Sequence, residues 1–208
     1  MKDENVVFDL DGVLLDSESD LSWLDRALVK ALKELGLQPS EENIEKLYPG
    51  GLVNFEEAVK EFPPPPAEVW EVRDKYYTAE KVEMIEEGKL RPFPDVRYLE
   101  DLEGDFSLGL ISNSPAEVVD SFLRKYDLRE LFQAWIGRGT GLEALKRIKP
   151  HPQPLEELSR EMGEGEYWYV GDRETDAEFA DKTGMNFLNL TRNGDGFADL
   201  GEVVDYLL

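Results

Sequence analysis

Short apolar runs alternate with longer amphipathic segments along most of this chain. The runs are rich in Val, Ile, Phe and Tyr, as buried strands usually are. They occupy Val6–Asp9, Phe106–Ile111, Ala134–Ile136, Tyr167–Val170 and Asn186–Leu190. Between most of them, apolar residues recur at the spacing of one helix face. This alternation predicts an α/β fold with a doubly wound, Rossmann-like parallel sheet.

Three of the amphipathic segments have recognisable ends. The first is expected to start with Ser114 as its N-cap and Pro115 as its first helical residue. The second is expected over Pro154–Met162 and the third over Glu174–Lys182, where Gly184 supplies a C-terminal stop.

The alternation breaks between about Ser17 and Leu90, where no strand is expected. Apolar residues there follow helical spacing, and four helices are predicted: Ser17–Leu35, Glu41–Tyr48, Asn54–Phe62 and Ala67–Glu87. The four prolines 63–66 must separate the last two, because proline ruptures a helix interior. We therefore expect an inserted all-α unit over residues 16–90, and a core formed by residues 1–15 and 91–208. The crossings between them are expected at residues 14–16 and 91–94.

Composition narrows the class of protein. The 208 residues suit one core with a modest insertion, and a hydrophobic fraction of 41% suffices to bury it. Cysteine is absent, so neither disulfides nor a cysteine nucleophile can be invoked. No run approaches the roughly 20 apolar residues of a membrane span, and no signal peptide is evident. A cytoplasmic location is the resulting expectation.

The charge balance is strongly acidic, with a net charge of −23. Such a field repels nucleic acid and anionic membranes, so neither is expected as a partner. One interpretation is simply a well-solvated surface. The other is adaptation to a high-salt cytoplasm, as in a halophile, where screening removes the repulsion between surface carboxylates.

Candidate chemistry lies at the ends of the predicted strands. The first strand delivers Asp9, followed two positions later by Asp11 and then by Gly12, which permits a sharp turn. Open α/β sheets bind ligands at this edge. Two carboxylates so placed can divide one reaction, with one attacking a centre and the other moving protons. A strand ending in a capped turn is the structural alternative.

Three later strand ends add complementary groups. Ser112 and Asn113 follow the second strand, where a hydroxyl beside backbone N–H groups suits an oxyanion or phosphoryl oxygen. Lys149 precedes a proline-rich loop that fixes where its side chain projects. That loop contains His151, the only histidine, which we interpret as a bystander.

The last strand end carries Asp172 and, one helical turn later, Asp176. Hard oxygen ligands on such a short frame suit Mg²⁺. If all these strand ends share one edge, then Asp9, Asp11, Asp172 and Asp176 converge. Two unit charges 4 Å apart repel by roughly 4 kcal/mol at an effective dielectric near 20. A divalent cation and Lys149 would largely neutralise the cluster.

These residues, in this order, resemble the haloacid dehalogenase-like superfamily of phosphotransferases. The resemblance runs from Val6 to Leu190, and its four motifs are Asp9–Val13, Ser112–Asn113, Lys149–Pro150 and Gly171–Asp176. The helical insert is similar to the family's first type of cap, which closes over the site. The gap between the second and third motifs is too short for a second cap.

The resemblance implies a role for each group. Asp9 is implied to be the nucleophile that forms an aspartyl-phosphate, and Asp11 the acid and then the base. Ser112 would hold a phosphoryl oxygen, and Lys149 would balance charge. Mg²⁺ is implied as cofactor, bound by Asp9, Asp172 and the main-chain carbonyl of Asp11, with Asp176 direct or through water. Gly12 and Asn113 are further candidates for phosphate binding.

Some positions depart from the family pattern or are open to two interpretations. Arg173 stands where relatives often carry a small residue, and it either contacts a substrate anion or faces solvent. Ile148 replaces a frequent glycine, and the segment 137–141 leaves the end of the third strand undefined. Gly50 and Gly51 lie in a candidate substrate loop or a plain connector. Four basic residues of the insert are candidates for a substrate carboxylate: Lys46, Lys60, Arg73 and Lys75.

The presence of Asp11 points to phosphate ester chemistry, because halide needs no acid on leaving. We expect a phosphomonoesterase acting on a small-molecule phosphate such as 2-phosphoglycolate or a sugar phosphate, in a monomer or homodimer. The alternative is a sugar-phosphate mutase, which needs a basic cap residue near Asp11. The residues 17–20 contain no histidine, which weakens that alternative. A non-catalytic binding or scaffold protein on the same fold stays open.

Overall fold

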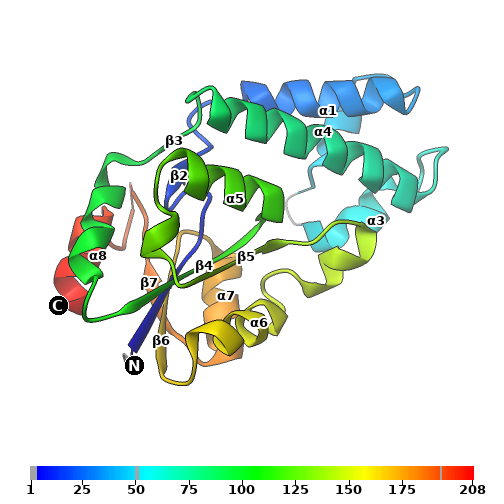
Figure 1. Ribbon diagram of the computed structural model, residues 1–208. Coiled ribbons are helices and arrows are strands. Elements are labelled where there is room, and N and C mark those ends of the chain that lie inside the picture. The colour runs from blue at the N-terminus through cyan, green and yellow to red at the C-terminus, as the bar shows by residue number, and fades with distance from the viewer. Residues whose placement is uncertain (1–3, 50–51, 193) are drawn as a thin grey trace.

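The protein consists of a parallel sheet with helices on both faces and of a separate group of helices, including α1 and α4, beyond one end of the sheet (Figure 1). The computed structural model describes residues 4–49, 52–192 and 194–208. The five-stranded sheet has the order β5-β4-β1-β6-β7, and every pairing is parallel. Its strands are β1 (Glu4–Phe8), β4 (Ser107–Pro115), β5 (Ala134–Arg138), β6 (Glu166–Gly171) and β7 (Asn186–Asn189). The predicted doubly wound α/β fold is confirmed.

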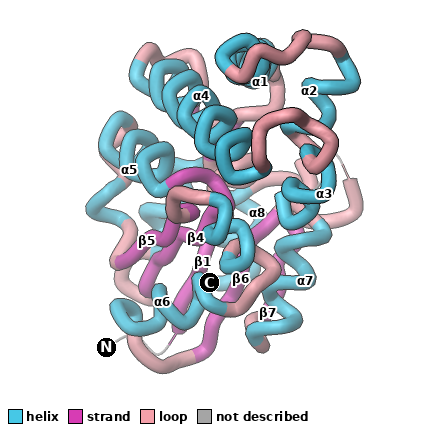
Figure 2. Tube along the Cα trace, turned by 90° about the vertical axis from the view of Figure 1, so that its right-hand side faces the viewer, coloured by secondary structure: helices cyan, strands magenta, loops and turns pink. Residues whose placement is uncertain are grey.

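The central strand β1 is apolar because helices cover both faces of the sheet. Val6 and Phe8 belong to a cluster that includes Val118 of α5, whereas Val7 points to the other face and joins Leu158 of α6. Figure 2 shows α6 and α7 in front of the strands. The core helices are α5 (Ala116–Lys125), α6 (Gln153–Met162), α7 (Glu174–Thr183) and α8 (Leu200–Leu207). Short 3₁₀ segments complete the core: η2 (Pro94–Leu102), η3 (Arg129–Leu131) and η4 (Leu142–Arg147).

The helical insert leaves and re-enters the core through one short ribbon. Its two strands, β2 (Leu15–Asp16) and β3 (Arg91–Pro92), pair antiparallel, so the two connections of the insert lie side by side. The helices of the insert are α1 (Ser22–Glu34), α2 (Glu41–Leu47), α3 (Phe55–Val59) and α4 (Pro66–Glu86), with η1 (Leu52–Asn54) before α3. Helices α1 and α4 run along each other at the top of Figure 1.

Several element boundaries differ from the prediction, and three of them lie close to the candidate site. Helix α1 begins at Ser22 instead of Ser17, and Leu21 is 48% exposed. Strand β4 continues through the predicted loop to Pro115, with an irregular register against β5 after Ile111. Helix α5 begins at Ala116, and Pro115 is its N-cap residue. The hydroxyl of Ser114 makes no cap, because it is bonded to a carboxylate described below.

The segment 137–141 also has a definite structure. Strand β5 ends at Arg138, and a Cβ on Gly137 would lie 2.5 Å from the Cα of Ala116. Glycine is needed there for the close approach of β5 to the start of α5. In the described parts of the chain, no helix has the length and apolar character that crossing a bilayer requires.

Candidate active site

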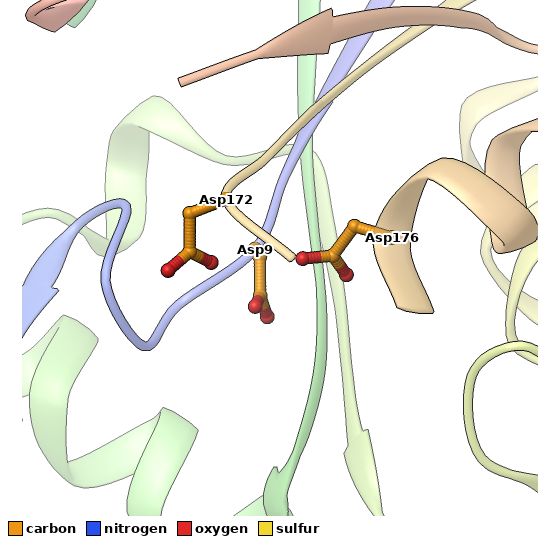
Figure 3. Close-up of side chains that lie close together, drawn as sticks. All are labelled: Asp9, Asp172 and Asp176. Carbon is orange, nitrogen blue, oxygen red and sulfur yellow. The ribbon is translucent and has the colours of Figure 1, made fainter. Parts of the chain in front are cut away.

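Three of the predicted carboxylates meet at the carboxyl edge of the sheet. Asp9 follows β1, Asp172 follows β6 and Asp176 stands in the first turn of α7. Each offers an oxygen atom within 4.8 Å of the others, and Figure 3 shows the three side chains grouped in this way. The parallel order of β1 and β6 brings these residues together although more than 160 positions separate them in the chain.

Two glycines allow the carboxylates to approach the backbone. Gly12 has a φ of +81°, and a Cβ there would lie 2.1 Å from Oδ2 of Asp172. A Cβ on Gly171 would lie 2.4 Å from the Cβ of Asp176. Both distances are far below contact, so only glycine leaves room for the cluster. The N–H of Gly12 donates to the carbonyl of Leu15, and Gly12 provides space and a turn here; its part in phosphate binding stays a prediction.

Lys149 is buried against this cluster. Its Nζ lies 2.9 Å from Oδ1 of Asp9 and 2.7 Å from Oδ1 of Asp176. It also donates to the hydroxyl of Tyr169 at 2.6 Å. The side chain of Asn113 holds the Lys149 loop by accepting from its N–H and donating to its carbonyl oxygen. Asn113, predicted as a phosphate ligand, thus positions the lysine through its side chain.

The net charge of the cluster would be balanced by a divalent cation. Three carboxylates and one ammonium group leave two net negative charges. Burial raises the pKa of Asp9 to about 6, although Lys149 opposes the shift. Burial and the neighbouring charge of Asp9 raise the pKa of Asp172 to about 7. Oδ1 of Asp172 is buried and accepts no hydrogen bond from any described residue. These orphaned, mutually repelling oxygens fit a hard metal ion.

The carboxylate of Asp11 lies outside this cluster, which corrects the prediction that all four aspartates converge. Its Oδ1 accepts from Ser17 at 2.6 Å and from Lys81, and its Oδ2 accepts from Ser114 at 2.6 Å. Burial alone would raise its pKa, but Lys81 and these hydrogen bonds outweigh burial and lower the pKa to about 2.

Lys81 is the main group that the sequence reasoning missed. It projects from α4 of the insert and is 1% exposed. Its ammonium group also donates to Ser114 at 2.9 Å and to the hydroxyl of Tyr77 at 3.3 Å. A lysine one turn after Tyr77, in a row with the buried Met84 and Ile85, was the available signal.

A cavity of about 440 Å³ lies between the core and the helices of the insert. Its core-side walls include Asp9, Asp11, Ser112 and Lys149. Ser112 is buried, and its hydroxyl accepts from the N–H of Ser114 at 3.0 Å. Asp176 lines the cavity as well, so at least one group from each of the four motifs lies on its wall.

The remaining candidates have varied positions. Arg173 lines the cavity and forms an ion pair with Glu18. Ile148 is buried in the cavity wall. The N–H of Gln153 donates to Nδ1 of His151, outside the cavity. Gly50 and Gly51 lie outside the described residues.

Among the four basic residues named as candidates for a substrate carboxylate, three pair with acidic residues of the insert. Lys46 pairs with Glu42 and Glu61, Lys60 with Glu57, and Lys75 with Glu34. Only Arg73 lines the cavity.

The family model for haloacid dehalogenase-like hydrolases matches residues 6–190. The chain belongs to this family. Solved structures share the fold: a phosphatase of this superfamily from Thermococcus onnurineus is 24% identical, with a TM-score of 0.65, and the match covers 100% of this chain and 98% of that one. A subfamily IA hydrolase from Geobacter sulfurreducens is 23% identical, with a TM-score of 0.63, and the match covers 99% and 96%.

Curated relatives in sequence include two bacterial phosphoglycolate phosphatases. That of Aquifex aeolicus is 30% identical over 187 residues, which cover 86% of this chain and 80% of the relative. That of Cereibacter sphaeroides is 31% identical over 192 residues, which cover 89% and 84%. The predictions of the family and of a phosphatase enzyme are thus confirmed.

Proposed function

We propose that this protein is a Mg²⁺-dependent phosphomonoesterase that hydrolyses a small-molecule phosphate through an aspartyl-phosphate, with 2-phosphoglycolate as the first candidate substrate. The observation that carries the proposal is the cluster of Asp9, Asp176 and Lys149, which line a small cavity, with the half-buried Asp172 beside them. The names of the curated relatives support the substrate.

The proposed reaction assigns one step to each side chain. Oδ of Asp9 attacks phosphorus while the bond from phosphorus to the leaving oxygen breaks, and Asp11 gives that oxygen its proton. Water then attacks the phosphorus of the aspartyl-phosphate, Asp11 accepts the proton of the water, and Asp9 and inorganic phosphate are released. Lys149 and the hydroxyl of Ser112 would stabilise phosphoryl oxygens. Mg²⁺ would neutralise equatorial oxygens and would be held by Asp9 and Asp172, the main-chain carbonyl of Asp11, and Asp176 directly or through water.

The insert has a defined part in this proposal. We assign residues 16–90 to a cap domain that closes over the core of residues 1–15 and 91–208. Lys81 reaches Asp11 from the cap and favours its ionised form. Asp11 is then held ionised, and it can carry a proton in either step only when the ammonium group moves away. Cap position and proton transfer would thus be linked through one contact.

The test is a phosphate-release screen over metabolite phosphates, including 2-phosphoglycolate, with and without Mg²⁺ and in low and molar KCl. We expect metal-dependent release, and we expect Asp9→Asn to abolish it without unfolding the protein, because the change removes the attacking charge but little volume. Glu87→Gln, on the exposed end of α4, is the control. Full activity in purified Asp9→Asn would refute the nucleophile assignment.

A sugar-phosphate mutase is the second candidate, and one observation favours it. The basic residue that such an enzyme needs near Asp11 is present, but it is Lys81 of α4 instead of a residue in the segment 17–20. Phosphorus NMR of a hexose 1-phosphate incubated with the enzyme separates the two functions. A mutase converts it to the 6-phosphate, whereas a phosphatase yields inorganic phosphate.

A further inference from the structure

The cap side of the cavity contains a buried cation without an adequate partner. Arg73 of α4 lines the cavity and is 1% exposed. Its Nε donates to the carbonyl of Leu47 at 3.3 Å. Neither Nη1 nor Nη2 has a hydrogen-bond partner among the described residues. Four of the five donors of an arginine lie on these two nitrogens, so most of its bonding capacity is unused.

The nearest carboxylate does not neutralise Arg73. Oδ1 of Asp74 lies 3.9 Å from its Nη1, which is beyond hydrogen-bond distance. Asp74 instead accepts from Arg138 with both oxygens, at 2.6 and 3.1 Å. Two guanidinium groups thus share one carboxylate, and the group keeps one net positive charge.

Aromatic rings hold the guanidinium group of Arg73 in place. Its Cζ lies 4.3 Å from the ring centre of Tyr77, 5.2 Å from that of Trp70 and 5.7 Å from that of Tyr48. Cation–π contacts offset part of the cost of burial, but they satisfy no N–H donor. Burial accordingly lowers the pKa of Arg73. A fixed, dry guanidinium group with a free fork is suited to a planar anion that accepts two hydrogen bonds.

We infer that Arg73 is the specificity residue that binds a carboxylate on the leaving group of the substrate, while the phosphoryl group sits at Asp9. This inference rests on the proposed phosphatase function and adds the residue by which the site would select phosphate monoesters that carry a carboxylate. Tyr48, a residue that is 41% exposed, lines the same cavity as Arg73. The bound carboxylate supplies the charge that Arg73 lacks.

The experiment compares 2-phosphoglycolate with ethyl phosphate, in which a methyl group replaces the carboxylate. Arg73→Met removes the charge and keeps the length, and Arg73→Lys keeps the charge but loses the fork. Lys75→Met, on the same helix but exposed and paired with Glu34, is the control. For Arg73→Met we expect kcat/KM on 2-phosphoglycolate to fall by about 10- to 100-fold, the value of a charged hydrogen-bonded contact, and kcat/KM on ethyl phosphate to stay within about 3-fold. Arg73→Lys should fall between wild type and Arg73→Met.

A binding measurement separates this inference from the proposed reaction. In an Asp9→Asn background, which prevents turnover, calorimetry should show tighter binding of 2-phosphoglycolate than of ethyl phosphate, and Arg73→Met should remove the difference. Equal losses on both ligands would show a merely structural role and overturn the inference. Equal affinity of both ligands for the protein with intact Arg73 would do the same. Absence of phosphate release from every ester, with discrimination in binding retained, would refute the phosphatase and leave the carboxylate site standing.

Discussion

Asp9 and Asp11 are two residues apart, yet their surroundings shift their pKa values in opposite directions. Burial raises the pKa of Asp9 to about 6, whereas Lys81 and two hydroxyl groups lower that of Asp11 to about 2. Both carboxylates are buried, but Asp9 shares Lys149 with Asp176, whereas Asp11 has Lys81 and two hydroxyl donors to itself. Separate roles for the two carboxylates follow from these environments.

Asp11→Asn tests the division of roles. Para-nitrophenolate leaves without a proton, so the first step with para-nitrophenyl phosphate should survive the substitution, while attack by water on the aspartyl-phosphate should slow by about 100- to 10,000-fold. We therefore expect a burst of one nitrophenolate per enzyme followed by slow turnover, measured by stopped-flow absorbance. Ser19→Ala, on the exposed segment before α1, should show no burst. Steady turnover at the wild-type rate in Asp11→Asn would contradict the assignment.

The raised pKa values of Asp9 and Asp172, about 6 and about 7 against an ordinary 3.8, predict a pH-dependent response to metal. Between these values and 3.8 the folded protein holds protons that the unfolded chain has released, so stability of the metal-free protein falls as pH rises. Mg²⁺ can replace those protons. The rise in Tm caused by Mg²⁺, measured by calorimetry on chelator-treated protein, should be larger near pH 8 than near pH 5. An equal rise at both would count against metal binding at these residues.

At the scale of elements, α4 connects the helical insert to the carboxyl edge of the sheet. Within three turns it carries Arg73 at the cavity, Asp74 bonded to Arg138 of β5, and Lys81 bonded to Asp11. Charged and apolar residues therefore alternate on its buried side. The ion pair of Asp74 with Arg138 joins the insert to the sheet, and both side chains are nearly inaccessible to water.

Breaking this ion pair from one side should be costly. Asp74→Ala leaves Arg138 buried without its partner, and we expect a loss of about 3–5 kcal/mol in the free energy of unfolding, measured by urea titration. The double variant Asp74→Ala, Arg138→Met should recover part of that loss, because it removes the stranded charge as well. Strictly additive losses in the two single variants and the double variant would show that the pair is not coupled.

At the scale of the whole molecule, the net charge of −23 contrasts with the local charges of the cavity. Lys149, Lys81 and Arg73 all face it, so an anionic substrate meets cations at the site despite the field outside. Many surface carboxylates form only exposed ion pairs with lysine or arginine or form none, and the repulsion between these carboxylates opposes folding.

If the acidic surface is an adaptation to high salt, stability should rise with KCl, because screening reduces the repulsion between carboxylates within a Debye length of roughly 10 Å at 0.1 M. The measurement is a melting series from low to molar KCl, with a sodium chloride series as control for the identity of the cation. A Tm that stays constant would support a merely well-solvated surface.

Much of the fold was predictable because its signals are local. Strands β1 and β6 are buried on both faces of the sheet, so each is an apolar run that can be recognised in the sequence. Gly12 and Gly184 mark sharp turns because glycine adopts positive φ angles readily. Asp9, Lys149, Asp172 and Asp176 were predictable as a group because parallel strands place their carboxyl ends at one edge.

The tertiary structure alone decided the partners of these groups. The sequence predicted Ser114 as the N-cap residue of a helix. In the folded protein its hydroxyl instead donates a hydrogen bond to Asp11. Lys81 and Arg73 are 70 and 64 positions from Asp11 and Asp9 in the chain. Helical periodicity does not show which neighbour a charged residue on α4 will meet. The sequence by itself determined which chemical groups line the edge of the sheet. Only the tertiary packing decided the pKa values of these groups, including the docking of α4 that pairs Lys81 with Asp11 and leaves Arg73 without a full counter-charge, because desolvation and pairing depend on contacts between segments far apart in the chain.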